Sequence, residues 1–239
     1  NSAGVERINQ VKLLRSAQFA EDAGPTAHPV RPASYVEINN FYTLTIYEKG
    51  AEIVRMLHQL LGAETFRHAS DLYFAKFDGK AATLEDFIGC MQEASGLDLS
   101  QFMLWYSQAG TPELTCTARF DAAANSYTLT VKQHTPPTPE QAEKQPLMLP
   151  LKLVLFSSQG EAQPLILNGK NLGTETTLVI TQAEESFTFT GLASQPIASL
   201  LRGFSAPVKL NFASTPEELS LLLAKDNDSF NAWNAGQQL

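Results

Sequence analysis

The hydrophobic spacing of this 239-residue chain changes near residue 113. Before it, apolar side chains recur every three to four residues, as on the buried face of a helix. After it, they alternate with polar or smaller residues, as in half-buried strands. We therefore expect a multidomain α and β chain, with a helical unit over 1–112, a β-sandwich over 113–214 and the first helices of a further helical unit over 215–239.

Four closely spaced helices are predicted in the first unit, after an irregular, proline-punctuated stretch. Gly62 is expected to end the first of them in a left-handed conformation, which glycine adopts without a Cβ clash. Thr83 and Asp86 are spaced as a capping box at the start of the third. Helical spacing is already present in the first residues, so we expect Asn1 to lie inside an element. The four helices are expected near residues 53–61, 66–73, 84–94 and 99–107.

Five alternating segments predict the strands of the sandwich. A proline-rich run from His134 to Pro146 separates the second strand from the third and is expected to form a surface loop. Thr215, Pro216 and Glu218 carry the signature of a helix start, and Ser229 is expected to begin another helix. Two such short helices cannot bury their apolar side chains between themselves, so we expect the last unit to continue in a longer protein. The strands are expected near residues 114–118, 127–131, 151–155, 187–189 and 208–212.

Charge and composition argue against two classes of partner. The formal net charge is -8 and no Lys/Arg-rich run occurs, so the basic surface that nucleic acids require is missing. No apolar run approaches the roughly 20 residues that cross a bilayer, so we expect no membrane span. Cys90 and Cys116 fall in different predicted units, which favours two free, half-buried thiols and a reducing compartment.

The sequence contains no complete set of catalytic or metal-binding residues. Its histidines form no His-Glu-x-x-His pattern and have no second His or Cys at ligand spacing, so we expect no metal site within the chain. Residues 203–207 lack the second glycine of a nucleophile elbow, and residues 226–228 lack the glycine and distal glutamate of a calcium loop, so both are interpreted as turns. The histidines are expected in loops (His28, His134) or on helix surfaces (His58, His68).

One segment resembles a known enzyme family. Residues 39–52 read Asn-Asn-Phe-Tyr-Thr-Leu-Thr-Ile-Tyr-Glu-Lys-Gly-Ala-Glu. They resemble the Tyr-Glu-Lys-Gly-Ala-Glu stretch of the aminopeptidase N family, zinc-dependent gluzincins that remove N-terminal residues from peptides. The likeness, to the bacterial alanyl aminopeptidases in particular, continues in the same order through residues 105–112, 141–146 and 204–208. The chain is therefore similar to an interior stretch of such an enzyme.

The resemblance implies a fold and a site. The fold would be the helical C-terminal part of a thermolysin-like catalytic domain, an immunoglobulin-like β-sandwich and the start of an α-helical domain. Tyr47 matches the family's catalytic tyrosine, whose hydroxyl would stabilise negative charge on the scissile carbonyl oxygen. Tyr42 would form a wall of the pocket for the substrate's first side chain. Pattern alone favours ordinary amphipathic tyrosines, and Glu48 and Glu52 are expected to complement the helix dipole or face solvent.

The family's metal-binding helix, and its Gly-Ala-Met-Glu-Asn strand that holds the substrate amine, do not occur in this sequence. The resemblance therefore implies zinc in a longer parent enzyme, no zinc on this chain and no activity by this chain alone. It also implies peptide substrates, contacts with the remaining domains of the same polypeptide and a cytoplasmic location in a bacterium. The alternative is a non-catalytic interaction or scaffold module built from helices and a β-sandwich.

Overall fold

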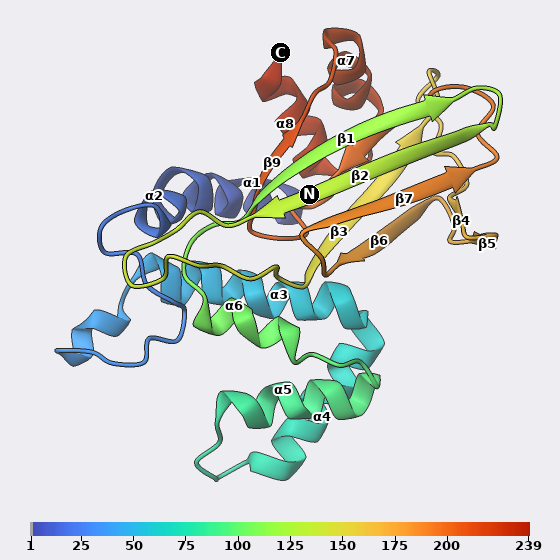
Figure 1. Cartoon of the computed structure of the whole chain (residues 1–239). Coiled ribbons are helices and arrows are strands. Elements are labelled where there is room, and N and C mark those ends of the chain that lie inside the picture. Colours follow the sequence, from blue (N-terminus) through green and yellow to red (C-terminus); the bar gives the residue numbers. More distant parts are fainter. Residues whose placement is uncertain (1) are drawn as a thin grey trace.

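The helices of the first half of the chain lie beside a β-sandwich, and the last two helices pack against the sandwich (Figure 1). A computed structural model describes residues 2–239, so the expectation for Asn1 lies outside the described residues. Among the residues described, no helix has both the length and the apolar character that crossing a bilayer requires.

Two helices of the first half each contain a π-helical turn, in which the chain winds more widely than in an α-helix. In the first, η1 (Leu14–Gln18) lies between α1 (Ser2–Leu13) and α2 (Phe19–Asp22). In the second, η3 (Thr45–Lys49) runs directly into α3 (Gly50–Leu61). The two π turns are in contact with each other. Such turns are rare and frequently occur at functional sites.

The other helices follow the predicted positions with two differences. The capping box of Thr83 and Asp86 is confirmed. Gly62 has a φ of 78° but a ψ of 158°, so the predicted left-handed cap is wrong. The reason is that Gly62 also caps the next helix, and an N-cap residue has an extended ψ. The helix expected over 99–107 is divided into two short turns. The remaining helical elements of the first half are η2 (Ile38–Phe41), α4 (Ala63–Phe77), α5 (Leu84–Ser95), η4 (Gln101–Met103) and α6 (Leu104–Ser107).

The predicted sandwich consists of two sheets, with strand orders β5-β4-β7-β2-β1-β9 and β6-β3-β8. β1 pairs antiparallel with β2 and parallel with β9, where Leu114 lies opposite Leu210. Four strands were not predicted, because β4 and β5 have two residues each and the apolar residues of β6 and β8 do not alternate with polar ones. His134, expected in a loop, is the last residue of β2. The strands are β1 (Glu113–Asp121), β2 (Ser126–His134), β3 (Leu149–Phe156), β4 (Ile166–Leu167), β5 (Lys170–Asn171), β6 (Glu175–Ile180), β7 (Glu184–Thr190), β8 (Ile197–Leu200) and β9 (Lys209–Phe212).

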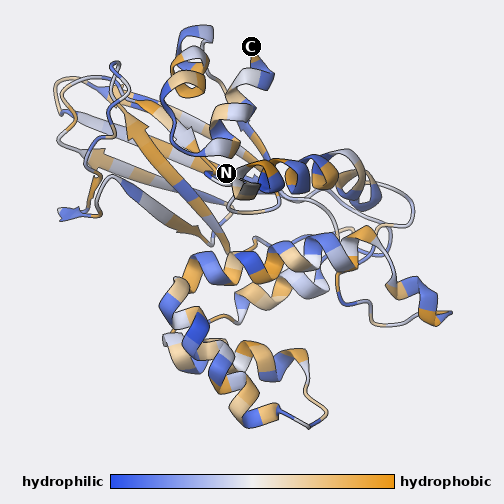
Figure 2. Cartoon of the chain, turned by 180° about the vertical axis from the view of Figure 1, so that it is seen from behind, coloured by the Kyte–Doolittle hydropathy of each residue, from blue (hydrophilic) through white to orange (hydrophobic). Residues whose placement is uncertain are grey.

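The hydrophobic core extends from the sandwich into the helices. Leu129 and Val131 of β2 are completely buried, and the same cluster includes Ile53 of α3 and Trp105 of α6. Figure 2 shows hydrophobic residues along both the strands and the neighbouring helices. The Trp105 indole donates a hydrogen bond from Nε1 to the carbonyl oxygen of Met148, at 2.7 Å. The buried cluster therefore continues across residue 112 without a break.

The last two helices are α7 (Pro216–Lys225) and α8 (Ser229–Gln238), and the predicted capping box of Thr215 and Glu218 is present. Their leucines are not buried between the two helices alone. Leu219 and Leu222 of α7 pack with residues of β3 in a second buried cluster, because the sandwich supplies the apolar surface that the helices lack.

Both cysteines are free thiols, Cys90 in α5 and Cys116 in β1. Their exposed fractions are 2% and 4%, so they are more deeply buried than the half-burial that was predicted. Burial raises the pKa of Cys116 to about 12. Because the reactive form of cysteine is the thiolate, Cys116 acts as a small core residue at neutral pH.

Candidate active site

The two predicted site residues, Tyr42 and Tyr47, lie next to each other in the structure. Tyr47 is in the middle of η3, and Tyr42 directly follows η2. Their rings stack with centroids 6.0 Å apart and planes inclined by 19°. Tyr42 is 71% exposed and Tyr47 is 57% exposed, so both phenol groups are accessible at the surface.

Local hydrogen bonds hold the backbone that presents Tyr47. The carbonyl oxygen of Thr43 accepts from the Tyr47 amide at 3.1 Å, and the Thr43 hydroxyl accepts from the Ile46 amide at 3.2 Å. Glu21 Oε1, from α2, accepts from the Thr45 amide at 3.0 Å. The first amides of a helix have no partner within the helix, so these bonds complete the helix start and fix its position against α2.

A buried ion pair lies beneath η3. Lys49 Nζ donates to Asp22 Oδ2 at 2.8 Å and to the carbonyl oxygen of Gly110 at 2.8 Å. The Thr111 hydroxyl donates to the same carboxylate oxygen at 2.9 Å. The Lys49 and Asp22 side chains are 1% and 0% exposed. Burial alone would raise the pKa of Asp22, but the charge of Lys49 and the hydrogen bonds to the carboxylate outweigh it, so this pKa lies below its ordinary value.

Sequence reasoning missed this ion pair, although one half of it left a signal. Lys49 lies four residues before Ile53 and eight before Leu57, which are both completely buried. Residues at that spacing share one face of a helix, so Lys49 falls on the apolar face. Its partner Asp22 is 27 residues away in the sequence, and no local pattern identifies it.

Glu52 was expected to complement the helix dipole or face solvent, and the solvent-facing prediction is wrong. Its side chain is 7% exposed and forms a bidentate ion pair with Arg7, with N–O distances of 2.6 and 2.7 Å. Arg7 also donates to the carbonyl oxygens of Gly203 and Phe204, at 2.9 and 3.0 Å. The side chain is buried because Arg7 of α1 compensates its charge and links it to residues 203–207, a turn that also carries the fully buried Phe204.

Residues 226–228, interpreted as a turn, accept hydrogen bonds from a second buried cation. Arg202 Nη1 donates to Asp226 Oδ1 at 2.5 Å, and the two side chains are 3% and 0% exposed. Arg202 Nε also donates to Glu175 of β6 at 2.8 Å. The Ser199 hydroxyl donates to the other Asp226 carboxylate oxygen at 2.5 Å. This turn therefore anchors α7 and α8 to the sandwich.

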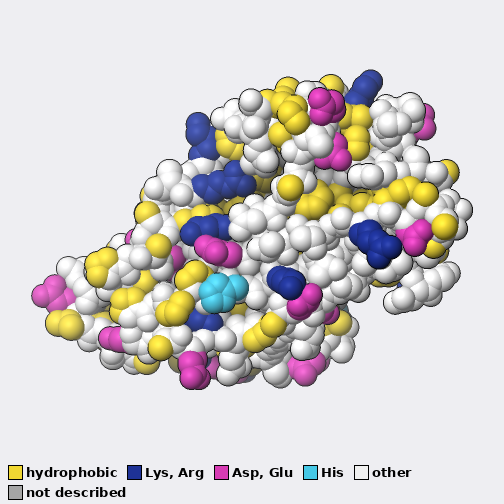
Figure 3. All heavy atoms as spheres, turned by 45° about the horizontal axis from the view of Figure 1, so that its top comes forward, with side chains coloured by type: hydrophobic (Ala, Val, Ile, Leu, Met, Phe, Trp, Pro, Cys, Tyr) yellow, Lys and Arg dark blue, Asp and Glu magenta, His cyan; other side chains and the backbone are white. Residues whose placement is uncertain are grey.

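The described side chains do not fit a metal ion. His58 and His68 are exposed on helix surfaces, as predicted. Within residues 2–239, no group of three or more His, Cys, Asp or Glu residues is arranged to hold a metal ion. On the face seen in Figure 3, Lys and Arg side chains lie among Asp and Glu side chains.

Comparison with known proteins identifies the family. Residues 5–106 match the model of the peptidase family M1 domain, and residues 110–213 match a domain of unknown function with an Ig-like fold. Aminopeptidase N of Escherichia coli strain K12 is 48% identical over 238 residues, which cover 100% of this chain and 27% of that protein. The chain belongs to peptidase family M1.

Other comparisons agree with this M1 assignment. Aminopeptidase N of Haemophilus influenzae is 50% identical over 238 residues, which cover 100% of this chain and 27% of that protein. The crystal structure of Legionella pneumophila aminopeptidase A in complex with aspartic acid matches with a TM-score of 0.76 and 29% identity, over 97% of this chain and 27% of that one. The M1 chain thus spans about 27% of the length of these relatives. The matches confirm the resemblance to aminopeptidase N and the predicted Ig-like fold.

The buried ion pair lies where the two matched parts of the M1 chain meet. Lys49 and Asp22 belong to the M1 domain match, whereas Gly110 and Thr111 are the first residues of the Ig-like match. The lysine that follows Tyr47 by two residues is therefore in contact with the start of the Ig-like domain.

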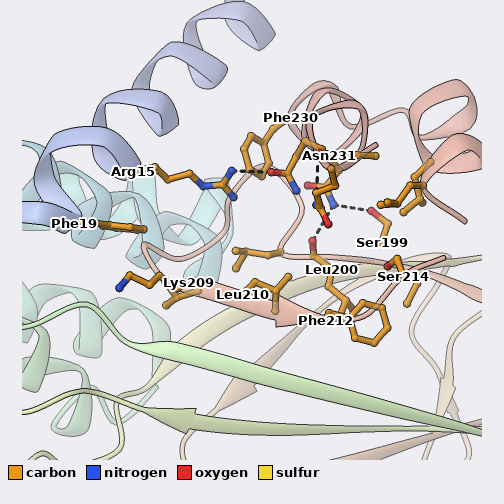
Figure 4. A pocket seen from close by; sticks show the side chains of 18 residues that line it. Arg15, Phe19, Ser199, Leu200, Lys209, Leu210, Phe212, Ser214, Phe230 and Asn231 are labelled. Carbon is orange, nitrogen blue, oxygen red and sulfur yellow. Dashed lines mark hydrogen bonds between the residues drawn. The ribbon is translucent and has the colours of Figure 1, made fainter. Parts of the chain in front are cut away.

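A cavity of about 340 Å³ lies elsewhere in the M1 chain, between η1, β8, β9 and the last two helices (Figure 4). Arg15 Nη1 donates to Asn234 Oδ1 at 2.7 Å, and the Arg15 guanidinium lies 5.2 Å from the centroid of the Phe230 ring. Burial lowers the pKa of Arg15. Neither Tyr42 nor Tyr47 lines this cavity, so it is separate from the pair of tyrosines.

Proposed function

We propose that this chain is part of a zinc aminopeptidase and supplies the tyrosine that stabilises the transition state, Tyr47, together with the Ig-like linker domain. The observation that carries the proposal is an exposed phenol at the start of an M1-domain helix, stacked on a second exposed tyrosine. The bacterial relatives named aminopeptidase N support hydrolysis of N-terminal residues from peptides. Broad specificity and a cytoplasmic location are further parts of the proposal.

Zinc in this proposal belongs to the parent enzyme. The described residues do not provide a ligand group, so other domains of the same polypeptide would bind the ion. The metal would supply an activated water molecule for attack on the peptide carbonyl. This chain without the other domains would therefore be inactive.

Tyr47 acts in the proposal as a hydrogen-bond donor. Negative charge develops on the carbonyl oxygen of the substrate as its carbon is attacked. A donor held in place beforehand stabilises this charge more than it stabilises the uncharged ground state. The Thr43 and Glu21 contacts supply such preorganisation for the backbone around Tyr47. Tyr42, stacked on Tyr47, would form a wall of the pocket for the substrate's first side chain.

The proposal is tested by Tyr47→Phe in the full-length enzyme. Loss of the hydroxyl is expected to lower kcat for an aminoacyl nitroanilide by about 100- to 1000-fold, because one oxyanion donor is removed. KM is expected to change little, because the lost interaction is made in the transition state. Turnover close to that of the wild type would refute the role of Tyr47.

Tyr35→Phe provides a matched control for this test. Tyr35 is 58% exposed, compared with 57% for Tyr47. It lies in the segment before η2, and the centroid of its ring is 4.7 Å from that of Phe41. The same atom is removed from a similarly exposed ring. The kcat of this variant is expected to equal that of the wild type.

The alternative function is a non-catalytic interaction or scaffold module. It is favoured by the lack of a metal-ligand group among residues 2–239. The two functions differ in what the gene encodes before Asn1. An aminopeptidase requires a His-Glu-x-x-His motif in that region, because two histidines one helical turn apart bind the zinc. A start codon directly before Asn1 would instead support the scaffold module.

A further inference from the structure

We propose that Lys49 and Asp22 are positioning residues for Tyr47 and that the start of the Ig-like domain holds them in place. The inference rests on the proposed function of Tyr47. It gives the β-sandwich a part in catalysis beyond connecting two domains.

Tyr47 and Lys49 belong to the same π turn and point in nearly opposite directions. Residues two positions apart in a helix project from opposite sides of it. Tyr47 is accordingly 57% exposed, while Lys49 is 1% exposed. Fixing the Lys49 ammonium therefore fixes the rotation of this turn, and with it the direction of the Tyr47 phenol.

The π turn is attached to α2 and η1 at two points. Two residues after Tyr47, Lys49 Nζ donates a hydrogen bond to Asp22 at 2.8 Å. Two residues before Tyr47, Thr45 is completely buried. Its amide donates to Glu21, and its hydroxyl accepts from Gln18 Nε2 at 3.3 Å. The two residues that flank Tyr47 at a spacing of two are thus both held by the neighbouring helix. The phenol is left as the exposed group between two buried anchors.

The boundary with the Ig-like domain completes this arrangement. Gly110 offers its carbonyl oxygen to Lys49 with a φ of 95°, a conformation that favours glycine. A Cβ atom at Gly110 would lie 3.2 Å from Cγ2 of both Thr135 and Thr138, in the loop that follows β2. Lys144 of the same loop donates to the carbonyl oxygen of Ala109 at 2.9 Å. The loop of the sandwich therefore fixes the carbonyl group that Lys49 contacts.

Stability alone is a weak reason for this ion pair. Replacing a buried ion pair with apolar residues of similar size is often neutral or stabilising, because the ions lose their hydration. An ion pair does, however, have a directional geometry that apolar side chains lack. Contacts on both sides of Tyr47 would hold its phenol in one direction. Such control matters because a small misplacement of a reacting group can cost about 100-fold in rate.

The test is a double-mutant cycle in the full-length enzyme. Lys49→Met is expected to lower kcat by roughly 10- to 100-fold with little change in KM. In a Tyr47→Phe background, Lys49→Met is expected to have almost no further effect on kcat, because the residue acts through the hydroxyl that is already absent. An equal effect in both backgrounds, or a wild-type kcat for Lys49→Met, would overturn the proposal.

Arg202→Met is the matched control. It also removes the cation of a buried pair, with Asp226, but this pair lies among β6, β8 and the turn between α7 and α8. The kcat per folded and zinc-loaded molecule is expected to be unchanged in this variant. An equal loss of this kcat in Arg202→Met and Lys49→Met would mean that the loss is not specific to the ion pair behind Tyr47, and it would overturn the proposal.

A second variant covers the case in which Lys49→Met does not fold, because it leaves Asp22 charged and buried. Lys49→Met/Asp22→Leu removes both charges, which favours folding. Its kcat is expected to be low, as for the single variant, whereas a folded double variant with wild-type kcat would overturn the proposal. Thr111→Val removes the hydroxyl donor on the sandwich side. Its kcat is expected to fall, and an unchanged kcat would exclude the Thr111 hydroxyl from the arrangement.

The outcomes separate this inference from the proposed function. Wild-type turnover of Tyr47→Phe would refute the function itself, and the positioning role with it. A slow Tyr47→Phe variant together with a fast Lys49→Met variant would refute only the positioning role.

Discussion

The Lys49 ammonium and the Asp22 carboxylate are both removed from water. Each buried ion loses several kcal/mol of hydration, and the attraction between them offsets this loss only if further hydrogen bonds are made. The Gly110 carbonyl oxygen and the Thr111 hydroxyl make these bonds. At the scale of single residues, removing one partner is therefore expected to cost far more stability than removing both.

Asp22→Asn is expected to destabilise the chain in a pH-dependent way. At neutral pH it leaves the Lys49 charge buried without a counter-ion, which is expected to lower the free energy of unfolding by about 3–5 kcal/mol. The pKa of Asp22 is lowered in the folded state. The stability that the carboxylate contributes is therefore fully present above its unfolded pKa, near 4, and is lost as the pH falls through the lower folded pKa.

Urea unfolding followed by circular dichroism at several pH values between neutral and about pH 3 checks this expectation. The difference in unfolding free energy between wild type and Asp22→Asn should be constant down to about pH 5 and should shrink below about pH 4. Asp71→Asn, in an exposed i,i+4 pair with Arg67, should change stability little at any of these pH values, because water screens the pair. A difference between wild type and Asp22→Asn that is the same at every pH would contradict the expectation.

At the scale of helices and strands, the elements that the sequence predicted are those with strong local signals. The capping boxes at Thr83 and Thr215 involve residues three apart, so a short window contains all the information. The π turn at 45–49 could not be predicted, because its contacts with α2 and η1 join residues far apart in sequence. The parallel pairing of β1 with β9 could not be predicted either, because the two strands are far apart in the sequence.

The residues of the candidate site also differ in how far the sequence could predict them. Tyr42 and Tyr47 were found through a resemblance, since spacing alone treats them as ordinary surface tyrosines. The buried charges around them depend on partners 27 and 45 residues away, and a single sequence does not pair them. For Lys49 and Glu52, a position on the apolar face of the continuous helix formed by η3 and α3 was the available signal.

At the scale of the whole molecule, the helical part and the sandwich are joined by polar contacts as well as by the shared core. Gln101 Nε2 donates to the carbonyl oxygens of Pro146 and Thr181, at 3.0 and 2.7 Å. Gln108 and Gln145 exchange two hydrogen bonds, at 3.1 and 2.8 Å. The Gln101 bonds connect the end of the M1 match with the Ig-like match, and the Gln108 bonds join the short segment between the two matches to the Ig-like match. Opening this interface would expose both the core and these polar groups.

The two parts are therefore expected to unfold together, and Trp105 can report on their interface. Trp233→Phe leaves Trp105 as the single tryptophan of the two in the sequence. Trp105 is 1% exposed and bonded to Met148, so its fluorescence changes when helices and sandwich separate. In urea, the fluorescence and circular dichroism transitions should have the same midpoint. A Trp105 transition at clearly lower urea would instead mean that the sandwich and the helices separate before either unfolds, and the contact between Lys49 and Gly110 would then be lost in a partly folded molecule.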